Sequence, residues 1–159
     1  MKIFIRTTGE RSLTQFDKIE YEILLDEQKT GCKGYFEQMK KLSTIDDDVL
    51  LLEDDIQLKK TFFKCLNDTI EMSNNKYIIN MSQPSAIIQL CEPKQFYWTR
   101  AVYYPRESIK KFMAKYDESY LNESKYYDII QQHLLIDKYI GVPSIMNLID
   151  LNLPSIMTY

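Results

Sequence analysis

Short apolar runs separated by polar segments predict that strands and helices alternate in the first half of the chain. Residues 2–6 (KIFIR) and 21–25 (YEILL) are each predicted to form a strand, and the apolar centre of 46–55 (DDDVLLLEDD) a third. Residues 31–42 and 58–72 carry apolar side chains at helical spacing, so both are predicted as helices. The uninterrupted apolar centre of the third strand is typical of a parallel strand covered on both faces. This order predicts an α/β half with a parallel sheet.

The second half of the chain has a less regular pattern. Its predicted elements are short strands at 76–80 and 85–90, an aromatic strand pair or bent strand at 95–105, helices at 106–116 and 124–140, and one short strand near 145–148. With only 4 Gly and 5 Pro and no internal repeat, the chain has little room for a flexible linker. We therefore expect one domain.

Composition narrows the class of protein. At 159 residues, with 45% apolar and 27% charged residues, the chain fits a single soluble globular domain. A net charge of −3 and a pI near 5.3 do not favour a general nucleic-acid binder. The 3 cysteines lack CxxC spacing and predict reduced thiols in a cytoplasmic protein. Neither a signal peptide nor an apolar run long enough to span a membrane is expected.

The candidate chemistry begins where the third predicted strand ends, at Glu53, Asp54 and Asp55 in LLLEDDIQL. Three adjacent carboxylates repel one another unless water or a cation neutralises them. They fit either a solvated strand end or a divalent-metal site. Because the chain has a single histidine, His133, a metal would be held by oxygen, which favours Mg²⁺ or Mn²⁺. Asp55, past the edge of the sheet, is the favoured direct ligand.

Other polar side chains are predicted at the same edge, where the carboxyl ends of parallel strands collect ligands. They follow the first two strands and are Arg6, Thr7, Thr8 and Asp26. Lys33 lies with Gly31 and Gly34 at the start of a predicted helix, where free amides and a lysine favour an anion. Glycines that merely begin a helix explain that segment equally well.

Two features of the second half have both a functional and a structural interpretation. Tyr97 and Trp98 lie in an aromatic segment that could line an acceptor groove, although core packing is favoured for Phe96 and Trp98. Asp128 is a lone acid in a helical segment, where it could act as a general base or simply face water.

Three segments together resemble a known family. IFIRTTGER, the glycine-started helix and LLLEDDIQL resemble the small nucleotide-sugar glycosyltransferases of the GT-A fold that bacteriophages encode, and more distantly the lipooligosaccharide galactosyltransferase type. FYWTRAVYYPRESIKKF resembles the acceptor-side segment of that family, and VPSIMNLIDLNLPSI its closing segment. The resemblance implies a single-domain, GT-A-like (Rossmann-like) three-layer α/β sandwich with a mostly parallel sheet. Residues 1–80 would form its nucleotide-binding half and 81–159 its acceptor-side half.

The resemblance also implies roles for individual residues. Arg6, Thr7 and Thr8 would cradle the nucleotide, Asp26 would face its base or ribose, and Lys33 would approach the diphosphate. Asp54 and Asp55, with Glu53 behind them, would hold Mn²⁺ or Mg²⁺, and Asp128 would be the base. Tyr97 and Trp98 would contact the acceptor. Asn147 lies near the place of a family histidine and would be a weaker metal ligand through its amide oxygen.

The sequence thus predicts a metal-dependent glycosyltransferase that moves a sugar from a nucleoside-diphosphate sugar to a hydroxyl acceptor. A modified DNA base, a protein or a glycan are the candidate acceptors. A non-catalytic nucleotide- or partner-binding protein on the same fold is one rival, and a Mg²⁺-dependent phosphatase or nuclease is another. The sequence leaves a homo-oligomer open.

Overall fold

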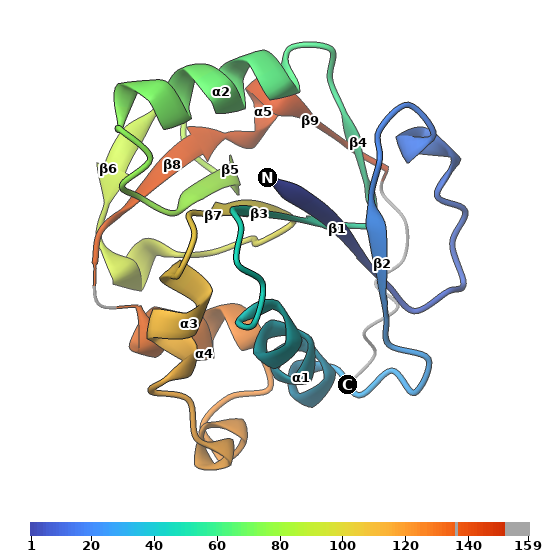
Figure 1. Ribbon diagram of the computed structural model, residues 1–159, viewed down its shortest axis with the longest axis vertical. Helices are drawn as coiled ribbons and strands as arrows, with labels where there is room; N and C mark the ends of the chain where they lie inside the picture. The colour runs from blue at the N-terminus through green and yellow to red at the C-terminus, as the bar shows by residue number, and fades with distance from the viewer. Residues whose placement is uncertain (136, 152–159) are drawn as a thin grey trace.

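Seven strands form the central sheet of the computed structural model, which describes residues 1–135 and 137–151 (Figure 1). In sheet order they are β2 (Glu22–Leu25), β1 (Lys2–Thr7), β3 (Val49–Glu53), β7 (Ala101–Tyr104), β5 (Ile79–Gln83), β8 (Tyr139–Pro143) and β6 (Gln89–Cys91). Strands β1, β2, β3, β5 and β8 run in one direction, whereas β7 and β6 run against them. The sheet is therefore mostly parallel, as predicted.

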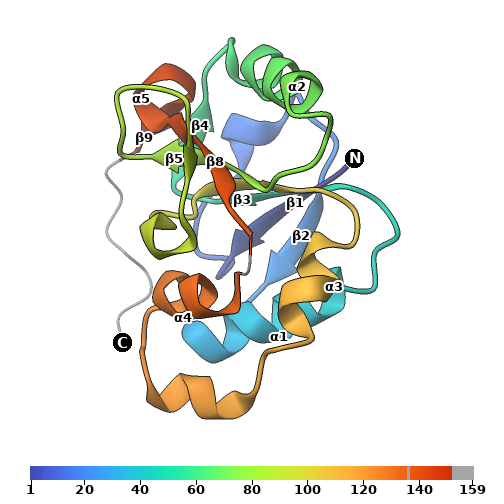
Figure 2. The same cartoon turned by 90° about the vertical axis from the view of Figure 1, so that its left-hand side faces the viewer.

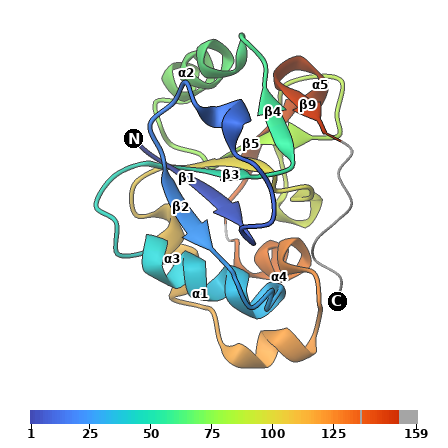
Figure 3. The same cartoon turned by 90° about the vertical axis from the view of Figure 1, so that its right-hand side faces the viewer.

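Helices cover both faces of this sheet (Figures 1 and 2). One face carries α1 (Cys32–Leu42), α3 (Ser108–Met113) and α4 (Tyr127–Leu134), and the other carries α2 (Phe62–Met72) and α5 (Ser144–Asn147). A separate two-stranded sheet, β4 (Ile56–Leu58) with β9 (Leu148–Asp150), lies beside α5 (Figure 3). Short 3₁₀ helices occur at Thr14–Phe16, Pro93–Gln95 and Glu118–Asn122. The predicted single-domain, Rossmann-like three-layer α/β fold with a mostly parallel sheet is confirmed.

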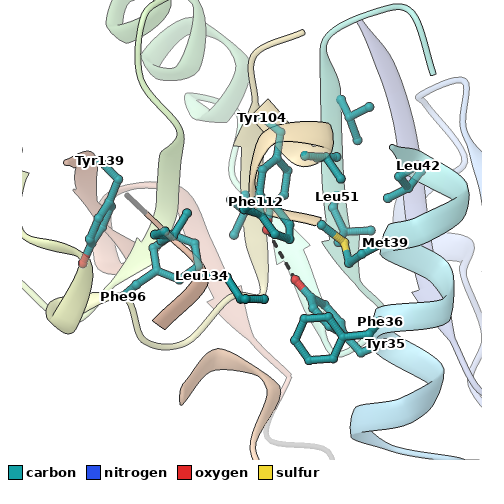
Figure 4. Packing of buried hydrophobic residues seen from close by; sticks show 14 of the residues in the cluster. Tyr35, Phe36, Met39, Leu42, Leu51, Phe96, Tyr104, Phe112, Leu134 and Tyr139 are labelled. Atoms are coloured by element: carbon teal, nitrogen blue, oxygen red, sulfur yellow. Dashed lines mark hydrogen bonds between the residues drawn. The ribbon is translucent and has the colours of Figure 1, made fainter. Parts of the chain in front are cut away.

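The two faces of β3 contribute to two separate hydrophobic cores. Val49 and Leu51 point toward the α1 side, where Tyr35, Phe36 and Met39 of α1 are packed (Figure 4). Leu50 and Leu52 point the other way and pack with Phe62 and Leu66 of α2. All of these side chains are at most 2% exposed, and burying each stabilises the fold by roughly 1.5–3 kcal/mol. Burial on both faces explains why the strand is apolar throughout.

Several predicted elements have different bounds in the structure. The helix expected at 58–72 begins at Phe62, because residues 56–58 form β4. Strand β5 (Ile79–Gln83) begins three residues later than the predicted strand 76–80, and β6 (Gln89–Cys91) begins four residues later than the predicted strand 85–90. Only the second part of 95–105 is a strand, β7. The helix expected at 106–116 is shortened to α3.

The largest error concerns residues 124–140, which were predicted as one helix. Helix α4 ends at Leu134, and Tyr139–Pro143 instead form β8 between β5 and β6. Apolar residues continue past the helix end, so periodicity alone does not mark the boundary. Near 145–148, where a strand was predicted, the chain forms α5 before β9 begins at Leu148.

Gly34, in the first turn of α1, leaves room for the loop that precedes the helix. A β-carbon at this position would lie 2.3 Å from Thr30 Oγ1 and 2.6 Å from Asp26 Oδ2. Both atoms belong to a hydrogen-bonded pair, in which the Thr30 backbone N–H and hydroxyl donate to Asp26 Oδ1 at 3.1 and 3.0 Å. The pair therefore has little freedom to move away from a larger residue.

We expect Gly34→Ala to lower the free energy of unfolding by about 1–3 kcal/mol, because the added methyl group overpacks this contact. Lys33→Ala is the matched control: Lys33 is exposed on the same turn and should leave stability nearly unchanged. Urea unfolding of both variants measures the difference. Equal stability of the two would contradict the proposed close packing.

Candidate functional site at the carboxyl edge of the sheet

The carboxyl ends of β1, β2 and β3 meet at one edge of the sheet. The register places Arg6 opposite both Leu24 of β2 and Glu53 of β3, so the polar residues that follow these strands are neighbours, as predicted. The antiparallel strand β7 begins at this same edge. Its first residues are joined to β3 by a hydrogen bond from the Glu53 N–H to the Arg100 carbonyl at 2.8 Å.

Arg6 lies buried beneath this edge. Its Nε donates to Gln38 Oε1 at 2.9 Å, and its guanidinium lies over the rings of Tyr35 and Tyr127, 5.4 and 5.3 Å from their centroids. The two rings stack at 4.1 Å. With 5% of its side chain exposed, Arg6 binds protein groups and holds β1, α1 and α4 together. The expected contact of Arg6 with a nucleotide stays a prediction.

Asp26 also has a structural role. Both of its oxygens are engaged, Oδ1 by Thr30 and Oδ2 by the Arg6 guanidinium at 3.8 Å, and the residue is 8% exposed. The anion at the start of α1 is thus the Asp26 carboxylate of the protein itself. The expectation that Asp26 faces a base or ribose stays a prediction. Lys33 is exposed on the first turn of α1, and its approach to a diphosphate stays a prediction.

The three consecutive carboxylates occupy three different environments. Glu53 accepts a hydrogen bond from the Tyr127 hydroxyl and lies 3.7 Å from Arg6. Asp54 accepts from the Thr7 hydroxyl at 2.5 Å and from Arg11 at 2.8 Å. Thr7 is therefore bound to Asp54, and its expected contact with a nucleotide stays a prediction. Both oxygens of Asp54 and the Oε1 of Glu53 are engaged by protein groups.

Asp55 differs from its two neighbours. Its Oδ1 is buried and has no hydrogen-bond partner within the described part of the chain. Burial raises the pKa of Asp55; Arg100 and Arg11 oppose the increase, whereas the carboxylates of Asp54 and Asp150 add to it. An unpaired carboxylate oxygen between arginines can accept a metal ion or a hydrogen-bond donor of a ligand. The Thr8 hydroxyl, also buried and unpaired among the described residues, lies on the loop that follows β1.

Asn147 does not join this group. It lies in α5, where its Nδ2 donates to the Pro143 carbonyl at 3.2 Å. The β4–β9 ladder places Asn147 beside Lys59, whereas the Asp55 carbonyl accepts from Leu151 at the opposite end of the ladder. The Asn147 Oδ1 is also buried without a hydrogen-bond partner among the described residues, and its expected part in a metal site stays a prediction. More generally, residues 1–135 and 137–151 contain no cluster of three or more His, Cys, Asp or Glu side chains suited to a metal ion.

Sequence reasoning missed three charged residues that surround Asp55. Arg11 pairs with Asp54, and Arg100 pairs with Asp150 of β9, which is opposite Ile56. These contacts join residues about 40 to 50 positions apart. Only the order of strands brings them together, and the sequence offered no local signal for it.

Asp128 lies in the first turn of α4, half-buried beside the aromatic segment. Its carboxylate accepts from the Ile129 N–H at 2.9 Å, and the backbone of Trp98 lies nearby. Burial raises the pKa of Asp128, and backbone hydrogen bonds partly offset the increase. A fixed carboxylate with a raised pKa is suited to accept a proton.

The aromatic segment divides into core and surface. Phe96 is fully buried, as the core interpretation predicts, whereas Trp98 is 54% exposed and Tyr97 40% exposed. Tyr103 and Tyr104 belong to the core. Trp98 has a φ of 51°, in the left-handed region that large side chains seldom adopt. The core interpretation of Trp98 is therefore wrong.

Comparison with known proteins supports the fold. No protein-family model and no curated protein matches this chain. The crystal structure of A197 from STIV is similar, with a TM-score of 0.51 and 14% sequence identity, covering 91% of this chain and 83% of that chain. A likeness at this identity shows a shared fold. None of the helices in the described residues has the length and apolar character that a bilayer-spanning segment needs.

Glu53 makes stability depend on pH. Burial raises the pKa of Glu53 from 4.5 to about 7, although Arg6 opposes the increase. The folded state therefore favours the protonated form. Protonated Glu53 therefore stabilises the folded state. This stabilisation is complete below pH 4.5 and is lost as the pH rises through about 7.

We expect wild type to lose up to about 3 kcal/mol more stability than Glu53→Gln between roughly pH 5 and pH 8, because the variant cannot ionise. Urea unfolding at both pH values measures this difference. Glu37→Gln, on the exposed side of α1, is the control and should behave like wild type. Parallel pH profiles for wild type and Glu53→Gln would contradict the prediction.

Proposed function

We propose that this protein is a glycosyltransferase that transfers a sugar from a nucleoside-diphosphate sugar to a hydroxyl acceptor. The observation that carries the proposal is the buried, unpaired Oδ1 of Asp55 at the carboxyl end of β3. In α/β sheets of this kind, ligands bind outside the carboxyl ends of the strands. Arg11 and Arg100 interact electrostatically with Asp55, so a diphosphate at this position would meet positive charge.

The residues present fit a weakly held Mn²⁺ or Mg²⁺. Asp55 would supply one direct oxygen ligand, whereas Glu53 and Asp54 are already bound to protein groups. Mg²⁺ commonly keeps several waters and binds through one or two carboxylates together with substrate phosphates. When bound, the ion supplies Lewis-acid stabilisation of the departing diphosphate. We therefore expect the metal to bind together with the nucleotide and only weakly to the free protein.

The remaining residues would act on the donor and acceptor directly. Arg11 and Arg100 would offset the charge of the diphosphate, and the unpaired hydroxyl of Thr8 and the exposed Lys33 would extend the nucleotide contact. Asp128 would accept the proton of the attacking hydroxyl, since its carboxylate is held in place by backbone hydrogen bonds.

Two rival functions make different predictions. A Mg²⁺-dependent phosphatase or nuclease that uses the same carboxylates would release phosphate or nucleotides without transferring a sugar. A non-catalytic binding protein would retain nucleotide binding without transfer. The two experiments that follow separate these outcomes.

We expect Asp55→Ala to weaken binding of a nucleoside-diphosphate sugar at least tenfold in the presence of Mn²⁺ and to abolish the effect of the metal. Calorimetry with UDP- and GDP-sugars, with and without Mn²⁺, measures both. Asp46→Ala is the matched control, because Asp46 lies before β3, at the opposite end of the sheet, exposed and paired with Arg106. If Mn²⁺ changes the affinity of wild type for none of these nucleotides, the metal-dependent enzyme is excluded.

We expect Asp128→Asn to lower the transfer rate by about 10²- to 10⁴-fold while donor binding is unchanged, because a general base contributes that much. In wild type the rate should fall with decreasing pH through a pKa above the usual 3.8 of an aspartate, since only the ionised form accepts a proton. Mass spectrometry of transfer products measures the rate, and Asp117→Asn, on the exposed loop after α3, is the control. Transfer at the wild-type rate would rule out Asp128 as the base.

A further inference from the structure

Residues 95–98 form a segment that we call the aromatic loop. Each of its four backbone carbonyls accepts a hydrogen bond from a side chain elsewhere in the fold. The donors are Gln83 Nε2 to the Gln95 carbonyl at 3.0 Å, Gln132 Nε2 to Phe96 at 3.0 Å, Asn80 Nδ2 to Tyr97 at 2.7 Å, and Ser82 Oγ to Trp98. The Tyr139 hydroxyl also donates to the Gln95 carbonyl. The loop is thus fixed along its length.

Most of these donors come from β5, a central strand where apolar residues would be expected. Asn80, Ser82 and Gln83 are 0%, 1% and 6% exposed. Buried polar groups lower stability unless each is hydrogen-bonded, and these are: the Asn80 Oδ1 also accepts from the Ser82 N–H at 3.0 Å. Gly141 of β8 makes room for this arrangement, because a β-carbon there would lie 2.9 Å from Gln83 Cγ.

The consequence of this anchoring is a rigid display of aromatic side chains. Trp98 is held at a φ of 51°, and its carbonyl accepts a hydrogen bond from the Ser82 hydroxyl. Its side chain nevertheless projects 54% exposed, and that of Tyr97 40%. Strained, over-determined backbone that exposes large side chains is a feature of binding sites.

We infer that Tyr97 and Trp98 form a preorganised subsite for a sugar ring of the acceptor, with Asn80, Ser82, Gln83 and Gln132 as its positioning residues. This inference rests on the proposed function and names the acceptor as a carbohydrate. Aromatic side chains offer large amphipathic faces on which the C–H face of a sugar ring can lie. The Asp128 carboxylate adjoins Trp98, so a hydroxyl of the bound ring would lie near the base.

Charge favours a sugar over a nucleic acid at this subsite. The chain carries a net charge of −3, and residues 91–99 contain one basic side chain, Lys94, and one acidic side chain, Glu92. Arg100, which follows, is paired with Asp150. A polyanion would also meet the Asp128 carboxylate, whereas a neutral sugar hydroxyl can donate a hydrogen bond to it.

The chain has a single tryptophan, so its fluorescence reports on this subsite alone. With UDP and Mn²⁺ present, wild type is titrated with methyl glycosides of glucose, galactose, mannose and N-acetylglucosamine, and separately with a deoxythymidine oligonucleotide. We expect a saturable change of Trp98 emission with at least one glycoside and none with the oligonucleotide. A response to the oligonucleotide alone, or to no glycoside, overturns the inference.

Two variants test how the subsite is built. Tyr97→Ala removes an exposed ring and should weaken glycoside binding at least tenfold with an unchanged unfolding midpoint. Gln132→Leu removes the hydrogen bond to the Phe96 carbonyl and should weaken glycoside binding, whereas Gln89→Leu, on β6, should not. Unchanged glycoside affinity in Tyr97→Ala overturns the inference.

Calorimetry of nucleotide binding keeps the two proposals separate. Metal-linked nucleotide binding without any glycoside response overturns the carbohydrate subsite and leaves the proposed function standing. Loss of glycoside binding in Gln132→Leu with wild-type nucleotide affinity supports a positioning role, because general unfolding would remove both.

Discussion

The buried guanidinium of Arg6 is the constraint around which the candidate site is arranged. It lies beside the stacked rings of Tyr35 and Tyr127 and within 4 Å of carboxylates from two other segments, Asp26 and Glu53. A buried charge is tolerated only with such partners, and removing one of them leaves the others uncompensated. The position of β1 relative to β3, α1 and α4 is therefore set by a single cation. Every polar group at the carboxyl edge is placed on this framework.

The framework explains why three adjacent carboxylates have three different chemistries. Glu53 is used to neutralise Arg6 and to accept from Tyr127, and Asp54 is used by Thr7 and Arg11. Asp55 follows the end of the strand, so neither set of partners reaches its Oδ1. Arg6 pairs with Glu53 and Arg11 pairs with Asp54, so these arginines reduce the repulsion among the three carboxylates. The site is thus one carboxylate supported by two others, and a metal bound there would depend on ligands from a substrate.

The sequence predicted what depends on local pattern and missed what depends on strand order. Strands β1 and β3 and helix α1 were found because long apolar periodicities mark them, and the convergence of Arg6 and Glu53 followed from the rule for parallel strand ends. The pairing of Arg100 with Asp150 was not foreseeable, because β9 reaches Arg100 only through its ladder with β4. Burial of Arg6 was missed for the same reason. The polar residues of β5, in INMSQ, were a readable signal: polar side chains in a central strand require partners.

The stretch from Trp98 to Arg100 links the two sides of the site. At one end, the Trp98 carbonyl accepts from Ser82, and the Trp98 backbone lies beside the Asp128 carboxylate of α4. At the other end, the Arg100 carbonyl accepts from the Glu53 N–H, and its guanidinium pairs with Asp150 beside Asp55. Trp98 and Arg100 therefore connect the surroundings of Asp128 with those of Asp55, and both lie at the carboxyl edge because the antiparallel β7 begins there. The same reversal that makes the sheet mixed thus brings the aromatic loop and Asp128 to the edge where Asp55 lies.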